Sequence, residues 1–156
     1  MKRFFITIDT EGDNLWDWRE GMDIHTENAR FLPRFQTLCE EYGLKPTYLS
    51  NFEMISDSFF RVFAGNKQVQ GRCEIGLHLH AWNSPPVGDS LPAGNDPGAA
   101  YLIEYPENQM EEKIAFLTER IELCFGQKPI SHRAGRWATN SSASTVCAHS
   151  RNCWSD

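Results

Sequence analysis

Short apolar runs of strand length alternate with helix-length segments along most of this chain. Residues 2–9 are predicted to form a buried strand, because an aromatic and β-branched run ends there in a polar turn that contains Gly12. Further strands are predicted over residues 46–50, 73–80 and 129–132. Strands that alternate with helices pair in parallel through right-handed crossovers. The predicted fold class is therefore α/β.

Three helices are predicted between these strands. Residues 26–42 and 107–125 place apolar side chains three or four positions apart, and Gly43 and Gly126 stand where C-terminal caps belong. Residues 58–63 are predicted as a shorter helix. The first apolar face contains Ala29, Leu32, Phe35, Leu38, Cys39 and Tyr42, and the last contains Met110, Ile114, Leu117, Ile121 and Cys124.

Length and charge narrow the function classes. The chain has 156 residues, enough for one domain but short for a closed α/β barrel, which takes about 200 residues or more. With 21 acidic against 15 basic residues its formal net charge is −6, and the basic residues form no stripe. Nucleic-acid binding depends on Lys and Arg that neutralise phosphates, so no nucleic-acid partner is expected.

No segment predicts secretion or a membrane span. The apolar run that begins at Phe4 is stopped by Asp9, whereas a signal sequence needs about 7–15 apolar residues. No run approaches the roughly 18 apolar residues of a spanning helix. The five cysteines include no C-x-x-C pair, so we expect reduced thiols and a cytoplasmic location.

Polar side chains gather at the predicted ends of three strands. In parallel α/β sheets the functional site lies at the carboxyl ends of the strands. The first strand ends in carboxylates, the third in imidazoles, and the fourth in an imidazole and two guanidinium groups: Asp9, Glu11 and Asp13; His78 and His80; His132, Arg133 and Arg136. We expect these groups to meet on one rim of the sheet.

His78 and His80 predict a metal site. Residues two apart on a strand point to the same face, about 6.5–7 Å apart, so both imidazoles can reach one ion. A carboxylate from the first strand completes a site with open positions for water and substrate. Glu11 and Asp13 compete for that place, and Glu11 is preferred because a spacing of two returns it to the side of Asp9. An isolated H-x-H pair is more often an ordinary strand feature, but groups at two further strand ends favour the metal.

Such a site favours hydrolysis. A divalent metal polarises a carbonyl group and activates water, while a nearby free carboxylate takes the water's proton. Asp9 suits the role of this base if Glu11 binds the metal. Arg133 beside Asp9 would keep that carboxylate charged and oriented, because an opposite charge within ~4–6 Å favours the ionised form.

Four sequence blocks follow one another in the same order as the motifs of a known protein family. They are T-I-D-T-E from Thr7, K-P-T-Y-L-S from Lys45, E-I-G-L-H-L-H-A-W from Glu74 and S-H-R-A-G-R-W from Ser131. Together they resemble the polysaccharide deacetylases of the NodB-homology group, carbohydrate esterase family 4. The segments H-L-H-A-W-N-S-P-P and S-H-R-A-G-R-W are most similar to the WalW/WbmS-type branch, which is found with bacterial surface-polysaccharide genes.

The resemblance implies a partial (β/α) barrel that is incomplete at the C-terminus. It also implies a metal-dependent hydrolase that removes an N-acyl group, usually acetyl, from an amino sugar. By position, Asp9 would be the catalytic base and Arg133 the residue that orients it, while the metal ligands would be Glu11, His78 and His80. The expected cofactor is a divalent metal, zinc first, with manganese, cobalt or nickel as alternatives.

Aromatic and basic residues inside these motifs are candidates for binding the expected carbohydrate substrate. Trp82 stands where the family has its second metal histidine, so His80 is the substitute that geometry offers. Trp82 and Trp137 present aromatic faces that suit sugar rings, although a tryptophan is more often packed in the core or rim. Arg136 could bind an anionic sugar group through bidentate hydrogen bonds, or form a surface salt bridge.

The last residues fit the pattern less well. Residues 1–142 form the predicted deacetylase-like domain, whereas residues 143–156 show no helical apolar face. The family continues with further strands and a late general-acid histidine, and nothing around His149 resembles a strand end. We therefore expect a truncated protein with a frameshifted tail, since G+C-rich codons there could encode an amphipathic helix in the adjacent frame. An incomplete barrel would expose a sheet edge and invite homo-oligomer formation.

Three other interpretations remain. The chain could be a non-catalytic metal- or sugar-binding remnant of that fold, which lacks the general-acid histidine. It could be an amidohydrolase-type enzyme, although there the H-x-H pair ends the first barrel strand rather than the third. It could also be a structural domain without a metal.

Overall fold

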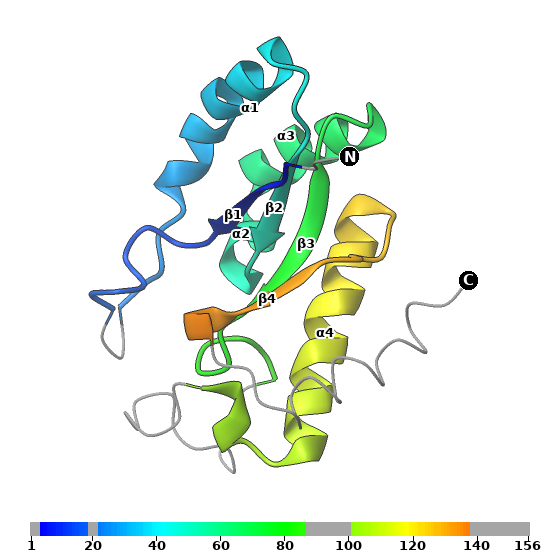
Figure 1. The fold of residues 1–156 in the computed structure, drawn as a ribbon. Helices are drawn as coiled ribbons and strands as arrows, with labels where there is room; N and C mark the ends of the chain where they lie inside the picture. Colours follow the sequence, from blue (N-terminus) through cyan, green and yellow to red (C-terminus); the bar gives the residue numbers. More distant parts are fainter. Residues whose placement is uncertain (1–3, 19–21, 87–100, 138–156) are drawn as a thin grey trace.

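Four parallel strands form a single sheet in the computed structural model, which describes residues 4–18, 22–86 and 101–137 (Figure 1). The strands are β1 (Ile6–Thr10), β2 (Pro46–Ser50), β3 (Glu74–Leu79) and β4 (His132–Ala134), and they pair in the order β1-β2-β3-β4. Each strand thus lies beside its neighbour in sequence. The predicted α/β class and parallel pairing are confirmed.

Helices connect the strands as the sequence pattern requires. They are α1 (Leu32–Glu41), α2 (Phe52–Ser56), α3 (Ser58–Val69) and α4 (Glu107–Phe125), with 3-10 turns η1 (Glu27–Phe31), η2 (Leu102–Glu104) and η3 (Gly135–Trp137). The boundaries of β2 and α4 match the prediction, and Gly126 ends α4 with a φ of 73°. The segment predicted as one helix over residues 26–42 is divided into η1 and α1, with Pro33 in the first turn of α1.

The outer strands and the second helical segment differ from the prediction. The first strand begins at Ile6 rather than at residue 2, and the last begins at His132 rather than at residue 129, because pairing with the neighbouring strand sets the boundary. The short helix expected over residues 58–63 continues to Val69. The unpredicted α2 precedes it, capped by the Asn51 side chain, which accepts from the Met54 amide at 3.0 Å.

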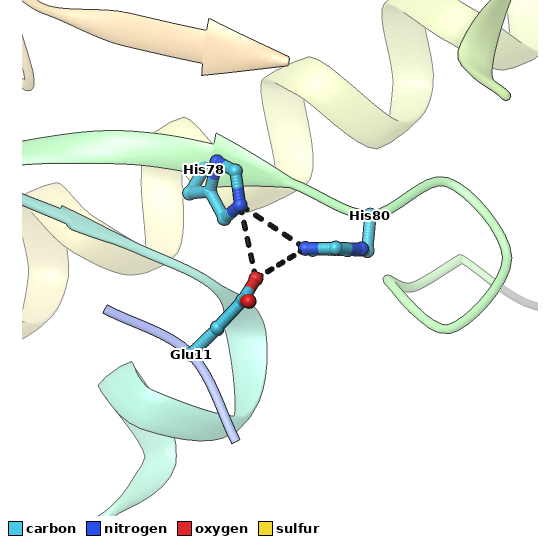
Figure 2. A group of neighbouring side chains, drawn as sticks. All are labelled: Glu11, His78 and His80. Atoms are coloured by element: carbon cyan, nitrogen blue, oxygen red, sulfur yellow. Dashed lines mark hydrogen bonds and ion pairs between the residues drawn. The ribbon is translucent and has the colours of Figure 1, made fainter. Parts of the chain in front are cut away.

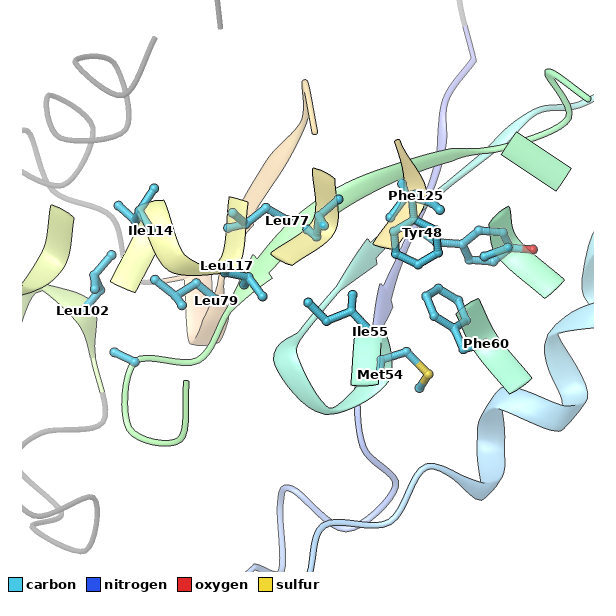
Figure 3. Packing of buried hydrophobic residues seen from close by; sticks show 14 of the residues in the cluster. Tyr48, Met54, Ile55, Phe60, Leu77, Leu79, Leu102, Ile114, Leu117 and Phe125 are labelled. Carbon is cyan, nitrogen blue, oxygen red and sulfur yellow. The ribbon is translucent and has the colours of Figure 1, made fainter. Parts of the chain in front are cut away.

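The hydrophobic core lies between the sheet and the helices (Figure 3). Leu77 and Leu79 on β3 pack in one cluster with Leu117 of α4. Each large apolar side chain buried in this way contributes about 1.5–3 kcal/mol. Because side chains alternate along a strand, residues between the core positions face the opposite side of the sheet. That opposite side carries Asp9 and His78, so the core determines where the polar groups lie.

Two residues of the expected apolar face of the first helix are not buried. Leu38 is 51% exposed and Tyr42 is 72% exposed, whereas the polar Gln36 is fully buried. The Gln36 Oε1 atom accepts a hydrogen bond from the Tyr48 hydroxyl at 2.8 Å, and its Nε2 atom donates to Glu40. Hydrogen bonding removes the cost of burying this amide, and the helix is therefore rotated relative to the predicted face.

Two further observations concern the thiols and the helices. Cys39, Cys73 and Cys124 are free thiols. Within the described ranges, no helix has both the length and the apolar character needed to cross a membrane.

Candidate metal centre

Three side chains from two strand ends converge at the carboxyl edge of the sheet (Figure 2). Glu11 Oε2 lies 2.6 Å from His80 Nε2 and 3.1 Å from His78 Nε2, and the two Nε2 atoms are 3.1 Å apart. Both imidazoles are buried, and Glu11 is half-buried. The structure therefore brings together the three residues that the sequence analysis selected as metal ligands.

Local structure at the end of β1 directs Glu11 toward the imidazoles. The main-chain oxygen of Glu11 accepts a hydrogen bond from Asn28 Nδ2 at 2.7 Å. Asp13 faces elsewhere, since its Oδ1 atom accepts a hydrogen bond from the main-chain N–H of Asn28 at 3.1 Å. Of the two competing carboxylates, Glu11 is the one beside the histidines.

His78 is oriented by the neighbouring strand. Its Nδ1 atom lies 2.9 Å from the main-chain oxygen of Arg133. A carbonyl oxygen can only accept, so Nδ1 carries the proton in this contact. In the neutral imidazole the lone pair is then on Nε2, the atom that faces Glu11 and His80.

The carboxyl group of Glu11 is held in its ionised form. Burial alone would raise its pKa, but hydrogen bonding with His78 and His80, and the positive charge of these rings when both nitrogens carry a proton, outweigh burial and lower the pKa of Glu11 to about 2. An anionic oxygen and two ring nitrogens thus share one small space. These atoms repel unless a proton or a cation lies among them.

This donor set fits a divalent transition metal. Two imidazole nitrogens and one carboxylate oxygen are ligands that zinc, manganese, cobalt and nickel accept. Ligand atoms of a tetrahedral zinc site lie about 3.3 Å apart, close to the separations between Glu11, His78 and His80. Three protein ligands leave a position open, as a catalytic site requires.

Asp9 and Arg133 form an ion pair next to this cluster. Arg133 Nη1 donates to Asp9 Oδ1, and Arg133 Nη2 donates to Thr7 Oγ1. The guanidinium group of β4 therefore reaches two side chains of β1, on the face of the sheet that carries the histidines. The pair leaves both groups partly exposed, so Asp9 can meet a water molecule or a ligand.

The fourth strand also carries His132, which is separate from the cluster. Burial, and then the charge of His78, lower the pKa of His132 to about 4, so this imidazole is neutral at pH 7. Alternation along β4 places His132 on the face opposite to Arg133. His132 is not part of the group formed by Glu11, His78 and His80.

The expected sugar-binding residues differ in their accessibility. Trp82 is only 8% exposed, and its ring packs 4.8 Å from Trp18 and 6.2 Å from His80, centroid to centroid. Its ring is therefore packed between Trp18 and His80 and largely shielded from solvent. Arg136 is exposed at the beginning of the segment after β4. Trp137 ends η3, and its side chain lies outside the described part of the structure.

One acidic residue near the site was not predicted. Glu53 lies in the first turn of α2, directly after β2, and its Oε1 atom accepts from Asn83 Nδ2 at 2.9 Å. Burial raises the pKa of Glu53 to about 7, and the negative charge of Glu11 adds to this effect. The rule that functional groups follow strand ends would have found it, had it been applied to the second strand.

Two solved structures share the fold. A mutant of BA3943, described as a CE4 family pseudoenzyme with restored enzymatic activity, matches with a TM-score of 0.59 and 14% identity over 93% of this chain and 40% of that chain. IcaB from Ammonifex degensii matches with a TM-score of 0.57 and 12% identity over 93% of this chain and 55% of that chain. No protein-family model matches the sequence, and no curated protein matches it.

These similarities establish the fold and leave the function to be argued from the site. The chain spans 40% and 55% of the two matched proteins, so it corresponds to a part of each. The predicted partial (β/α) barrel of the polysaccharide deacetylase type is confirmed as the fold of this chain.

Proposed function

We propose that this chain is a metal-dependent hydrolase that removes an N-acyl group, acetyl in the first instance, from an amino sugar of a bacterial surface polysaccharide or its precursor. One observation carries the proposal: the Glu11, His78 and His80 cluster adjoins the ion pair of Asp9 and Arg133 at one edge of the sheet. Metal-assisted hydrolysis requires a cluster of metal ligands beside a carboxylate that does not itself bind the metal.

Glu11, His78 and His80 would hold the metal in this proposal, with zinc as the first candidate and manganese, cobalt or nickel as alternatives. When bound, a divalent metal would polarise the amide carbonyl and favour deprotonation of water. Arg133 would support this metal site, because its main-chain oxygen orients the imidazole of His78.

Asp9 would act as the general base. Its carboxylate takes a proton from the attacking water, and the same proton can then pass to the nitrogen that leaves as the amine. Arg133 orients the carboxylate through Nη1, while Thr7 holds the other end of the guanidinium group. Proton uptake and return regenerate Asp9 in its starting state.

Sugar binding would involve the residues around the rim. Trp82 supports His80 from one side, and Arg136 and Trp137 follow β4. We also propose a cytoplasmic location, membership of the WalW/WbmS-type branch and self-association through a sheet edge. The frameshifted origin of residues 143–156 stays a prediction, because these residues lie outside the described part of the structure.

A second candidate function is non-catalytic binding of a metal or sugar. It is favoured by one specific observation: the matched BA3943 protein is described as a pseudoenzyme whose activity a mutation restored. The same fold therefore exists without activity. The two candidates share the metal cluster and differ in whether the acyl group is released.

Acetate release from N-acetylated amino-sugar oligomers tests the first function. The full chain, loaded with zinc, should release acetate, and Asp9→Asn should abolish the release while metal binding persists. Asp13→Asn is the matched control, because Asp13 lies two residues from the metal cluster but outside it. Zinc binding without acetate release from any oligomer would favour the second function.

A further inference from the structure

Arg136 has a strained backbone beside the candidate metal centre. Its φ of 55° and ψ of 19° lie in the left-handed region, which costs a non-glycine residue roughly 1 kcal/mol. Such strain persists where the surroundings hold the residue in place, and it concentrates at functional sites. Arginine is not among the residues enriched in this conformation. The position therefore calls for an explanation in terms of its side chain.

The turn that carries Arg136 packs closely against a metal ligand. A Cβ atom placed on Gly135 would lie 2.6 Å from the main-chain oxygen of Leu79 and 3.1 Å from Cγ and Nδ1 of His80. Only glycine allows this approach. The close packing therefore fixes the start of the Arg136 side chain relative to His80.

Aromatic rings from two other segments hold the guanidinium group. Arg136 Cζ lies 6.0 Å from the ring centroid of Trp16 and 6.0 Å from that of Tyr101. Trp16 is 74% exposed and Tyr101 is 38% exposed, so both rings also face solvent. Arginine on aromatic faces keeps its N–H groups available in the plane of the guanidinium group.

A small hollow joins this cation to the metal cluster. It has a volume of about 10 Å³, enough for one water-sized group, and it is lined by Leu15, Trp16, His80, Trp82 and Arg136. The guanidinium group therefore lies on the same side of the sheet edge as His80. A sugar bound over His80 would place a substituent within its reach.

Arg136 has no carboxylate partner among the residues of the three described ranges, where its contacts are the two aromatic rings. This argues against the alternative of a surface salt bridge. The whole chain carries a formal net charge of −6, and a cation without an ion pair beside His80 would offer an acidic ligand a positive charge at this edge of the sheet. Two parallel N–H groups suit the two oxygens of a carboxylate or a phosphate.

We propose that Arg136, Trp16 and Tyr101 form an anion-binding subsite, and that the substrate is an N-acylated amino sugar that also bears a carboxylate or phosphate group. The proposal rests on the proposed function, because the sugar's acyl group is taken to lie at the metal. It adds the class of the substrate. The aromatic rings would contact the sugar while the guanidinium group binds the acid.

Binding of three matched sugars tests the proposal. The probes are N-acetylglucosamine, its 6-phosphate and its 6-carboxylate, measured by isothermal titration calorimetry with the full chain, with and without zinc. At least one charged sugar should bind about 10-fold or more tightly than the neutral one. The preferred charged sugar identifies the acid: phosphate, carboxylate or both. Arg136→Gln should remove the preference, and Arg136→Gly should do so without backbone strain.

Arg30→Gln is the matched control, because Arg30 is also exposed and lies over an aromatic ring, 5.4 Å from the centroid of Phe59. This variant should keep the preference for the acid. Equal binding of all three sugars, no binding of any of them, or a preference that survives both Arg136 variants would overturn the subsite. Failure of the proposed function is a different result: the chain then shows neither zinc binding nor acetate release. The preference for a charged sugar requires neither of these, so the two failures can be told apart.

Discussion

The Nδ1 atom of His78 donates a hydrogen bond to the main-chain oxygen of Arg133 at 2.9 Å. The side chain of the same arginine binds Asp9. One residue of β4 thus orients a proposed metal ligand through its backbone and the proposed base through its guanidinium group. The two parts of the site are therefore coupled through β4.

Asp9→Asn should lower the rate of acetate release about 10²–10⁴-fold, because the amide cannot take a proton from water. Zinc affinity should stay within a few-fold of the wild-type value, since Asp9 is not one of the grouped ligands. Steady-state kinetics and calorimetry measure the two quantities. An active Asp9→Asn variant would remove Asp9 from the role of base.

Glu11→Gln should reduce the loss of unfolding free energy that the metal-free chain shows as the pH falls. The pKa of Glu11 is lowered to about 2 in the folded state, below its ordinary value of 4.5. Its ionised form therefore contributes stability that is fully present above about pH 4.5 and is lost as the pH falls toward 2. We expect wild type to lose about 1–3 kcal/mol more of its unfolding free energy than Glu11→Gln over this range.

Urea unfolding between pH 5 and pH 2 measures this difference. Asp13→Asn is the control and should keep the wild-type dependence, because Asp13 contacts neither histidine in the described structure. Parallel curves for wild type and Glu11→Gln would show that the contacts to His78 and His80 do not stabilise the charged carboxylate.

Glu53→Gln should change the pH dependence of stability in the direction opposite to that of Glu11→Gln, and at higher pH. Burial raises the folded-state pKa of Glu53 from 4.5 to about 7, so the folded chain holds this proton more tightly than the unfolded chain. Stability should therefore fall as the pH rises from about 5 to 8. The glutamine variant should lack this loss of about 1–3 kcal/mol.

Thermal and urea unfolding at several pH values between 5 and 8 would follow this change. Glu41→Gln, at the exposed end of α1, is expected to behave as wild type does. If Glu53→Gln and wild type lose stability equally over this range, Glu53 does not hold a proton in the folded chain.

Gly135→Ala should disturb both stability and metal binding. The added methyl group would lie 2.6 Å from the Leu79 main-chain oxygen and 3.1 Å from the His80 ring, so η3, the end of β3 or the imidazole must shift. We expect a loss of about 1–3 kcal/mol in unfolding free energy and weaker zinc binding. Gly65→Ala is the control, because its added methyl group makes an ordinary contact of 3.6 Å with Phe125. Unchanged zinc affinity in Gly135→Ala would show that His80 does not depend on this close packing.

Local patterns predicted the elements whose signals are contained in a few residues. β2 and α4 have the predicted bounds, and Gly126 caps α4 as its position indicated. The bounds of β1 and β4 were wrong because strand pairing, which no local pattern contains, decides where a strand begins. Phe4 and Ile130 belong to the apolar runs but are exposed, outside the paired segments.

The strand-end rule located most of the candidate site. It grouped Glu11, His78 and His80 although 67 residues separate Glu11 from His78, because parallel strands end at one edge. The spacing of two favoured Glu11 over Asp13, and in the structure Glu11 lies beside the histidines whereas Asp13 accepts from the main-chain amide of Asn28. The contact between His78 and the Arg133 carbonyl could not be predicted, since a main-chain oxygen leaves no signal in the sequence.

Zinc titration by calorimetry tests the central claim most directly. The metal-free full chain should bind one zinc ion, and Glu11→Gln, His78→Ala and His80→Ala should each weaken binding about 100-fold or more. His25→Ala removes an exposed histidine outside the cluster and should bind zinc as wild type does. Absence of stoichiometric binding by wild type, or equal binding by wild type and all three cluster variants, would contradict the metal site.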